Sequence, residues 1–287
     1  KQMSQYHQGQ FLFGKNQEKR IAHLCIFEYH LVAFYFLDEP SGQRYLRSLP
    51  DTLPRATHRQ KELHKPYFSH IQTLWIHAEE FANKADKVVI ACGDDPYTHS
   101  LNVNPQIFYY GLNEDNDIQA RDVEYRNDGT SFDVFVEDEY YGHFDLPLYG
   151  KHMLLNALAV IAVCHYERYD ARVVAKVLKT FKGAERRFKE TFVGNNVIID
   201  DYAHHPTEVK VTIKAARQKY PNKEVIAVFK PNTYSRTKEL ANDFVTALNY
   251  ADKAYVTDIT CDRELPSEFP GVTSDLIINE LNNGEQE

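Results

Sequence analysis

The stretch VIIDDYAHHPTEVKVTIKAA, residues Val197 to Ala216, decides the fold of the C-terminal part of the chain. An apolar run ends in two aspartates, which is typical of a buried strand that runs into a turn. Pro206 then opens a run of apolar residues at helical spacing, and proline is favoured at the first position of a helix. The stretch therefore predicts a strand, a short polar turn and a helix.

The same strand-then-helix order repeats after this stretch. Strands are expected at 195–200, 224–230 and 253–259, and helices at 206–220 and 235–250, with a further helix before the end of the chain. Strands separated by helices of this length imply crossover connections and a parallel sheet. The sequence thus predicts an α/β class, with a C-terminal domain over 186–287 whose sheet is mainly parallel.

The preceding part, 68–185, has a different pattern. Apolar spacing predicts helices at 70–85, 152–167 and 171–181, and a buried strand at 87–95 followed by one at 106–111. Three more strands are expected over 117–148, joined as antiparallel hairpins by turns at Asn127-Asp128-Gly129 and near Glu139. This part is interpreted as a second, central domain.

Residues 1–67 lack a comparable periodicity of apolar residues. The run at 27–37 is apolar and aromatic without a clear period, and 44–67 is basic and punctuated by prolines, so it is interpreted as loop or disorder. The beginning of the chain does not have the plan of a signal peptide, and no apolar run has the length of a membrane span. We expect this part to be divergent or poorly ordered.

Composition restricts the class of protein. The 287 residues carry a formal net charge of −8, which argues against nucleic acid as the main partner. The four cysteines are far apart and form no C-x-x-C pair, so they predict reduced thiols in the cytoplasm rather than disulfides or a zinc site. No membrane association is expected.

Polar turns follow two of the predicted parallel strands, at 200–205 and at 230–239. Ligands of open parallel sheets bind at the carboxyl ends of the strands, and helix N-termini attract anions. The alternatives for the first turn are a simple helix cap, a zinc site and part of an active site. In the second turn, Arg236 could clamp a carboxylate or phosphate, or could be a solvated helix residue.

Two further clusters contain candidate binding residues. His152 and Asn156 are four residues apart and share one face at the start of an apolar helix, either as an internal cap or as ligand contacts. Arg186 and Arg187 stand at a presumed hinge, either as a basic surface pair or as contacts to phosphate or ribose.

Four segments, in their order along the chain, resemble the Mur ligases. They are GKHMLLNALAVIA (150–162), FKGAERRF (181–188), IIDDYAHHPTEV (198–209) and AVFKPNTYSRT (227–237). The segments DDYAHHP and P-x-TYSRT are similar to those of the members that use L-alanine. The resemblance extends over about residues 68 to 260. It implies a partial central ATP-binding domain over 68–185 and a Rossmann-like C-terminal domain over 186–287.

The resemblance implies an ATP-dependent ligase of peptidoglycan synthesis. ATP, with Mg²⁺, would phosphorylate the lactyl carboxylate of UDP-N-acetylmuramate, and the amine of L-alanine would attack the acyl phosphate. Anions must be brought together in this reaction, so cations are required to screen them. By position, His152 and Asn156 resemble adenine-side residues, and Arg187 and Asp201 resemble contacts to the ribose and phosphates. Tyr202, His204, Asn232 and Arg236 resemble the surroundings of the amino acid.

The sequence also departs from the family pattern. The phosphate loop G-T-x-G-K-T/S and the E-A-D-E motif are absent, and only His64 could stand for the family's metal-binding histidine. Asn232 stands where a histidine is usual, Lys230 where glutamine is usual, and Met153 where asparagine is frequent. No UDP-sugar domain is found, and the C-terminal domain is expected to be short. The alternative is therefore a degenerate, truncated homologue that binds a nucleotide or another ligand without catalysis.

Overall fold

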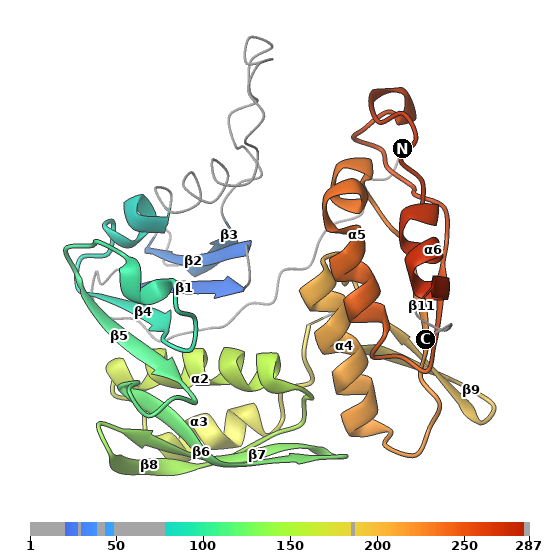
Figure 1. Cartoon of the computed structure of the whole chain (residues 1–287). Helices are drawn as coiled ribbons and strands as arrows, with labels where there is room; N and C mark the ends of the chain where they lie inside the picture. The colour runs from blue at the N-terminus through green and yellow to red at the C-terminus, as the bar shows by residue number, and fades with distance from the viewer. Residues whose placement is uncertain (1–20, 28–29, 39–43, 49–77, 185–186, 284–287) are drawn as a thin grey trace, which may run out of the picture. The chain divides into compact units, whose positions relative to one another are not determined.

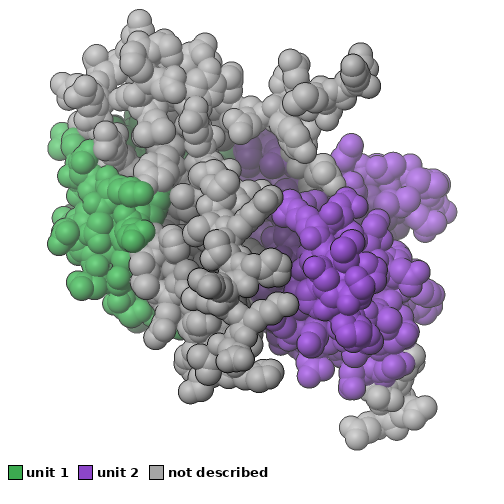
Figure 2. Space-filling model, turned by 90° about the horizontal axis from the view of Figure 1, so that it is seen from above, with its two compact units in different colours: residues 1–123, 132–144, 155–178 green, residues 124–131, 145–154, 179–287 purple. Residues whose placement is uncertain are grey.

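The computed structural model describes residues 21–27, 30–38, 44–48, 78–184 and 187–283, the first three segments by their backbone only. The chain divides into two compact units (Figure 2). Unit 1 comprises residues 1–123, 132–144 and 155–178, and unit 2 comprises 124–131, 145–154 and 179–287. The division crosses several strands and one helix, because short segments of the central region pack with the C-terminal residues.

An eight-stranded sheet forms the centre of the first part of the chain (Figure 1). Its strand order is β3-β2-β1-β4-β5-β6-β7-β8. The strands are β1 Ile21–Phe27, β2 His30–Asp38, β3 Arg44–Ser48, β4 Val88–Cys92, β5 Gln106–Gly111, β6 Ile118–Arg126, β7 Gly129–Val136 and β8 Glu139–Leu146. Pairing is parallel from β1 through β4 and β5 to β6, and antiparallel between β1 and β2 and between β2 and β3.

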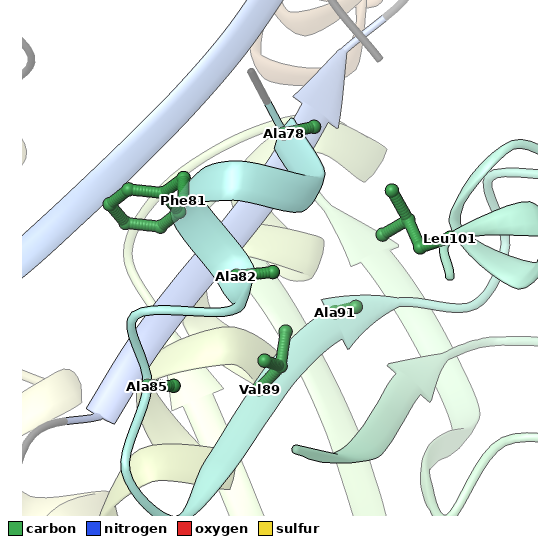
Figure 3. Packing of buried hydrophobic residues seen from close by; sticks show 7 residues of the cluster. All are labelled: Ala78, Phe81, Ala82, Ala85, Val89, Ala91 and Leu101. Carbon is green, nitrogen blue, oxygen red and sulfur yellow. The ribbon is translucent and has the colours of Figure 1, made fainter. Parts of the chain in front are cut away.

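The β4 strand is buried along its whole length, as expected of a parallel strand covered on both faces. A helical segment over 78–82 places Phe81 and Ala82 against Val89 and Ala91 of β4, with Leu101 on the same cluster (Figure 3). A short 3-10 helix, η1 Thr98–Ser100, follows β4, and Thr98 donates its hydroxyl hydrogen to the carbonyl of Cys92 at 2.7 Å. This contact fixes the turn at the carboxyl end of the strand.

Hairpins join the last three strands of this sheet. Residues 127–128 connect β6 to β7, and Glu137 and Asp138 connect β7 to β8. Both Glu137 and Asp138 have positive φ, 48° and 68°, as the turns that match strand twist require. Phe132 and Phe144 are fully buried with ring centroids 5.8 Å apart, so one face of these strands is closed by aromatic packing.

Two helices follow the sheet, α2 Lys151–Tyr166 and α3 Ala171–Leu178. The α2 helix is apolar nearly all round, and its buried residues include Leu154, Leu158 and Ile161. Such a composition predicts a helix enclosed by protein. None of the described helices is long and apolar enough to cross a membrane.

The remaining elements belong to unit 2. Strands β9 Lys189–Val193 and β10 Asn196–Asp200 pair antiparallel, and β11 Ile226–Phe229 pairs parallel with β12 Lys253–Val256. The helices are α4 Pro206–Lys219, α5 Tyr234–Leu248 and α6 Asp275–Asn283, with a short 3-10 helix η2 Pro266–Glu268. Val209, Phe229, Phe244 and Ile277 come from four of these elements and form one buried cluster. This core fixes the turns after β10 and β11.

The mixed α/β class is confirmed, with parallel pairing at the centre of the large sheet, from β1 through β4 and β5 to β6, and between β11 and β12. Two expectations were wrong in detail. Residues 44–48, read as loop, form β3, an edge strand of the sheet, where charged residues are tolerated. The strand at 195–200 was expected in the parallel sheet, but the described pairing of β10 is antiparallel to β9, through a turn in which Gly194 has φ 58°. Residues 21–27 and 30–38 of segment 1–67 form β1 and β2. The rest of that segment, and residues 70–77 of the expected first helix, lie outside the described residues.

Candidate functional site

Asp201 organises the turn after β10. Its Oδ2 accepts a hydrogen bond from the backbone N–H of Phe188 at 2.8 Å, and its Oδ1 accepts one from Ala203 at 2.9 Å. Only 12% of the side chain is exposed. Phe188 has φ 51°, an unusual conformation for a residue other than glycine. The carboxylate therefore holds residue 188, and with it the neighbouring Arg187, against the turn.

The turn ends in a capping box at the start of α4. His205 is the N-cap, and its Nδ1 accepts a hydrogen bond from the N–H of Thr207 at 3.4 Å. Glu208 reciprocates, because its Oε2 accepts from the N–H of His204 at 2.9 Å and from that of His205 at 3.2 Å. The two adjacent histidines thus have different roles, and the helix-cap interpretation is correct for His205.

Glu208 is also the electrostatic centre of the turn. Its carboxylate is 3.7 Å from Arg187 Nη1 and 3.4 Å from His204 Nδ1. Burial acts to raise the pKa of Glu208, but the N–H of His204 and the charges of His204 and Arg187 together hold that pKa below its ordinary value. Sequence interpretation did not single out this residue, although glutamate three residues after an N-cap is the signal of a capping box.

His204 is held in a defined orientation. Its Nδ1 is 2.8 Å from the carbonyl oxygen of Tyr202, and the two rings are 5.0 Å apart in an edge-to-face arrangement. A carbonyl only accepts hydrogen bonds, so Nδ1 carries a proton in either charge state, and in the neutral form Nε2 is the nitrogen without one. Tyr202 is half exposed.

Arg236 joins the turn after β10 to the turn after β11. Its Nη1 donates to the carbonyl oxygen of His204 at 3.2 Å and to Oδ1 of Asn232 at 3.0 Å. The structure therefore brings together His204, Asn232 and Arg236, three of the four residues expected around the amino acid. Tyr202 joins them through its contact with His204.

The N-terminus of α5 is capped by a residue from a distant loop. Thr233 occupies the N-cap position but makes no side-chain cap hydrogen bond. Instead the carboxylate of Glu264 accepts from the N–H groups of Tyr234 at 2.6 Å and Ser235 at 3.0 Å. Nothing in the local sequence pattern indicates a cap that comes from some thirty residues away.

His152 lies at the start of α2 and is also part of unit 2. Burial, followed by the positive charge of Arg187, lowers the pKa of His152 to about 4, so the ring is neutral near neutral pH. Its Nδ1 is buried without a hydrogen-bond partner among the described residues. A Cβ on Gly150, whose φ is 87°, would approach this ring to 2.9 Å, so glycine is required there.

Asn156 follows one turn later on α2, in unit 1, and is exposed. Arg187 is 4.0 Å from Asp201, so these two predicted nucleotide contacts are neighbours. The weak metal candidate His64 lies outside the described residues.

The groups that the resemblance implies are a nucleotide and Mg²⁺. The buried Nδ1 of His152 fits a polar group of a nucleotide, because a buried nitrogen without a partner is costly unless a ligand satisfies it. In the described part of the chain, no group of three or more His, Cys, Asp or Glu could hold a metal ion such as Mg²⁺.

The described residues form an α/β protein with polar side chains in the turns that follow β10 and β11, and in open α/β sheets ligands bind at the carboxyl ends of strands. Comparison with known families then identifies it. The chain belongs to the Mur ligase family. Residues 66–164 match the family described as "Mur ligase middle domain", and residues 186–286 match "Mur ligase, glutamate ligase domain".

Solved structures agree with this fold. UDP-N-acetylmuramate-alanine ligase MurC from Thermotoga maritima is 23% identical with a TM-score of 0.57, and the match covers 76% of this chain and 45% of that one. MurF ligase from Thermotoga maritima in complex with ADP is 18% identical with a TM-score of 0.55, covering 71% and 47%. A pseudomurein peptide ligase type C from Methanothermus fervidus is 20% identical with a TM-score of 0.53, covering 75% and 54%. The chain spans about half the length of these proteins.

Proposed function

We propose that this chain functions in an ATP-dependent ligase of peptidoglycan synthesis that joins L-alanine to UDP-N-acetylmuramate in the cytoplasm. The observation that carries the proposal is the pair of hydrogen bonds from Arg236 to the carbonyl of His204 and to Asn232. They join the two polar turns by holding the guanidinium of Arg236 against the backbone of His204. A guanidinium binds a carboxylate through parallel hydrogen bonds, and a neutral histidine accepts a proton, so the pair suits an amino acid.

In the proposed reaction, a carboxylate oxygen of UDP-N-acetylmuramate attacks the terminal phosphorus of ATP, and ADP leaves. The amine of L-alanine then attacks the carbonyl carbon of the acyl phosphate, inorganic phosphate leaves, and the amine loses a proton. Arg236 would bind the alanine carboxylate, and Nε2 of His204 would accept the proton because Nδ1 is engaged by Tyr202. Tyr202 and Asn232 would border the same site.

The nucleotide contacts belong to the same proposal. Arg187, held near Asp201 and Glu208, would approach the ribose and phosphates of ATP. His152 and Asn156 would face the adenine, where the neutral ring of His152 can donate or accept one hydrogen bond. Mg²⁺ would supply charge screening for the phosphates, through ligands that the described residues do not provide.

The test is phosphate release from ATP in the presence of UDP-N-acetylmuramate and Mg²⁺, with and without L-alanine. The proposal predicts release that depends on L-alanine and is lost in Arg236→Ala. Lys238→Ala is the matched control, because Lys238 is an exposed cation on the same helix. Absence of release in the wild-type chain would contradict catalysis by this chain.

A second candidate function is a binding module without ATP turnover. It is favoured by the absence of a G-T-x-G-K-T/S phosphate loop anywhere in the sequence, since that loop cradles the phosphates in the family. This candidate predicts that the chain binds L-alanine or a nucleotide but releases no phosphate. Binding measured beside the release assay separates the two candidates.

A further inference from the structure

Glu264 lies between β12 and η2 and makes three hydrogen bonds to the first turn of α5. Its Oε2 accepts from the N–H of Tyr234 at 2.6 Å and from that of Ser235 at 3.0 Å. Its Oε1 accepts from the hydroxyl of Ser235 at 2.5 Å. Both carboxylate oxygens are therefore engaged with one helix end, where a negative charge is also favoured by the helix dipole.

The first part of α5 depends on such an anchor. The helix has a non-helical residue at Leu240, with φ −117° and ψ 21°, so residues 234–239 are separated by a kink from the part that carries Phe244 and Leu248 into the core. The ring of Tyr234 stacks on Phe269, 6.1 Å away, which is a second contact to the loop of Glu264. The loop of Glu264 thus contributes directly to the position of this short segment, together with the buried Thr237.

Arg236 is in that segment, directly after Ser235. Its Nη1 is held at Asn232 and at the carbonyl of His204, an arrangement that requires the first turn to be in place. A shift of this turn by about one ångström would separate these atoms beyond hydrogen-bonding distance.

We propose that Glu264 is a positioning residue for Arg236 and thereby for the amino-acid site, an inference that rests on the proposed function. Glu264 occupies the N–H groups at the start of α5, so the carboxylate of the amino acid cannot bind to this helix end instead. The incoming amino-acid carboxylate is thereby directed to the guanidinium of Arg236. Glu264 acts through α5 and does not touch the substrate.

The experiment compares Glu264→Ala, Glu264→Gln and Glu268→Ala in the whole chain. Glutamine preserves the contacts, because its carbonyl oxygen can accept both backbone N–H groups and its amide can donate to the Ser235 hydroxyl. Glu268 is the matched control: it belongs to the same loop and also caps a helix end, but it accepts from Leu265 of η2 instead of α5. Ser235→Ala, which removes one of the three bonds, serves as a milder fourth variant.

Two measurements are made on each variant. The first is the NMR signal of the Arg236 Nε–H group, which reports the position of the guanidinium without any ligand. The second is the dissociation constant for L-alanine, measured by equilibrium dialysis with radiolabelled L-alanine. We expect Glu264→Ala to shift the Arg236 signal and to weaken L-alanine binding about fivefold, the effect of losing a typical helix cap. We expect Glu264→Gln and Glu268→Ala to remain within about twofold of wild type, and Ser235→Ala to shift the signal less than Glu264→Ala.

The two readouts distinguish failure of this inference from failure of the proposed function. If wild type does not bind L-alanine while the Arg236 signal moves in Glu264→Ala, the amino-acid site is wrong but the positioning role stands. An unmoved Arg236 signal in both Glu264→Ala and Ser235→Ala would overturn the positioning role. So would a Glu268→Ala variant that shifts the signal as much as Glu264→Ala. If Glu264→Ala does not fold, the signal in Ser235→Ala decides.

Discussion

Replacing Glu208 by alanine removes the acceptor that closes the turn after β10. In the native chain, Glu208 Oε2 accepts from the N–H groups of His204 and His205 at 2.9 and 3.2 Å. The side chain is 32% exposed, so water replaces the lost contacts only in part. Arg187 also loses a carboxylate 3.7 Å from its Nη1, but its side chain is 49% exposed.

The expected cost follows from these contacts. Loss of a helix cap costs about 1 kcal/mol, with a range of about 0.5–2 kcal/mol. The half-exposed pair with Arg187 adds at most a few tenths of a kcal/mol, because solvent screens it. We expect Glu208→Ala to lower the free energy of unfolding by about 1–2 kcal/mol. Glu208→Gln keeps an acceptor oxygen and should cost no more than about 0.5 kcal/mol.

The assay is urea unfolding followed by circular dichroism, repeated between pH 7 and pH 3. Because the pKa of Glu208 is lowered in the folded chain, its charge stabilises the fold above its unfolded pKa of 4.5. That contribution is lost as the pH falls through the folded pKa, so the wild type and Glu208→Gln should converge in acid. Equal costs for alanine and glutamine at pH 7 would refute the hydrogen-bonding argument, and so would an unaffected alanine variant.

Three further outcomes are expected. In a full-length ligase that contains this segment, His204→Ala or Arg236→Ala should abolish the use of L-alanine, and unchanged alanine kinetics in both variants would remove the assignment of the amino-acid site. Gly150→Ala should destabilise the chain by about 1–3 kcal/mol, because φ is 87° and the added Cβ meets the ring of His152, and an unchanged urea midpoint would contradict this. The ring signals of His152 in NMR should titrate near pH 4 rather than near 6.5, and a midpoint close to 6.5 would show that the ring is solvated.

The secondary structure of the described central and C-terminal regions was largely predictable because its signals are local. The strand QIFYYG was predicted with the bounds that β5 has, and the hairpin turns follow from short polar segments between alternating runs. The apolar character of 152–167 was enough to predict a buried helix, observed as α2. In each case the period of the side chains fixes the element without reference to distant residues.

The failures have a different origin, because they depend on pairing between segments. RYLRS forms the edge strand β3 only because β2 lies beside it, and five residues with two arginines carry no such information. Likewise KETFV was not recognised as the partner of β10, although the Gly194 turn between them was a usable hairpin signal.

The site shows the same limit. The resemblance named His204, Asn232 and Arg236, but not the hydrogen bond that crosses from Arg236 to the carbonyl of His204. Glu264 was not recognised at all, because a cap supplied from a distant loop is a property of the tertiary structure. The sequence therefore indicated which residue types could bind an amino acid. It did not indicate the hydrogen-bond partners that orient them.

The proposed function requires that the turns after β10 and β11 form an amino-acid site. The most direct test is a titration of the isotopically labelled chain with L-alanine, followed by NMR through the ring signals of His204 and the Nε–H signal of Arg236. We expect both signals to shift with one saturable dissociation constant, and the His204 response to be lost in Arg236→Ala. Signals that stay unmoved throughout the titration, or a His204 response that persists in Arg236→Ala, would contradict it.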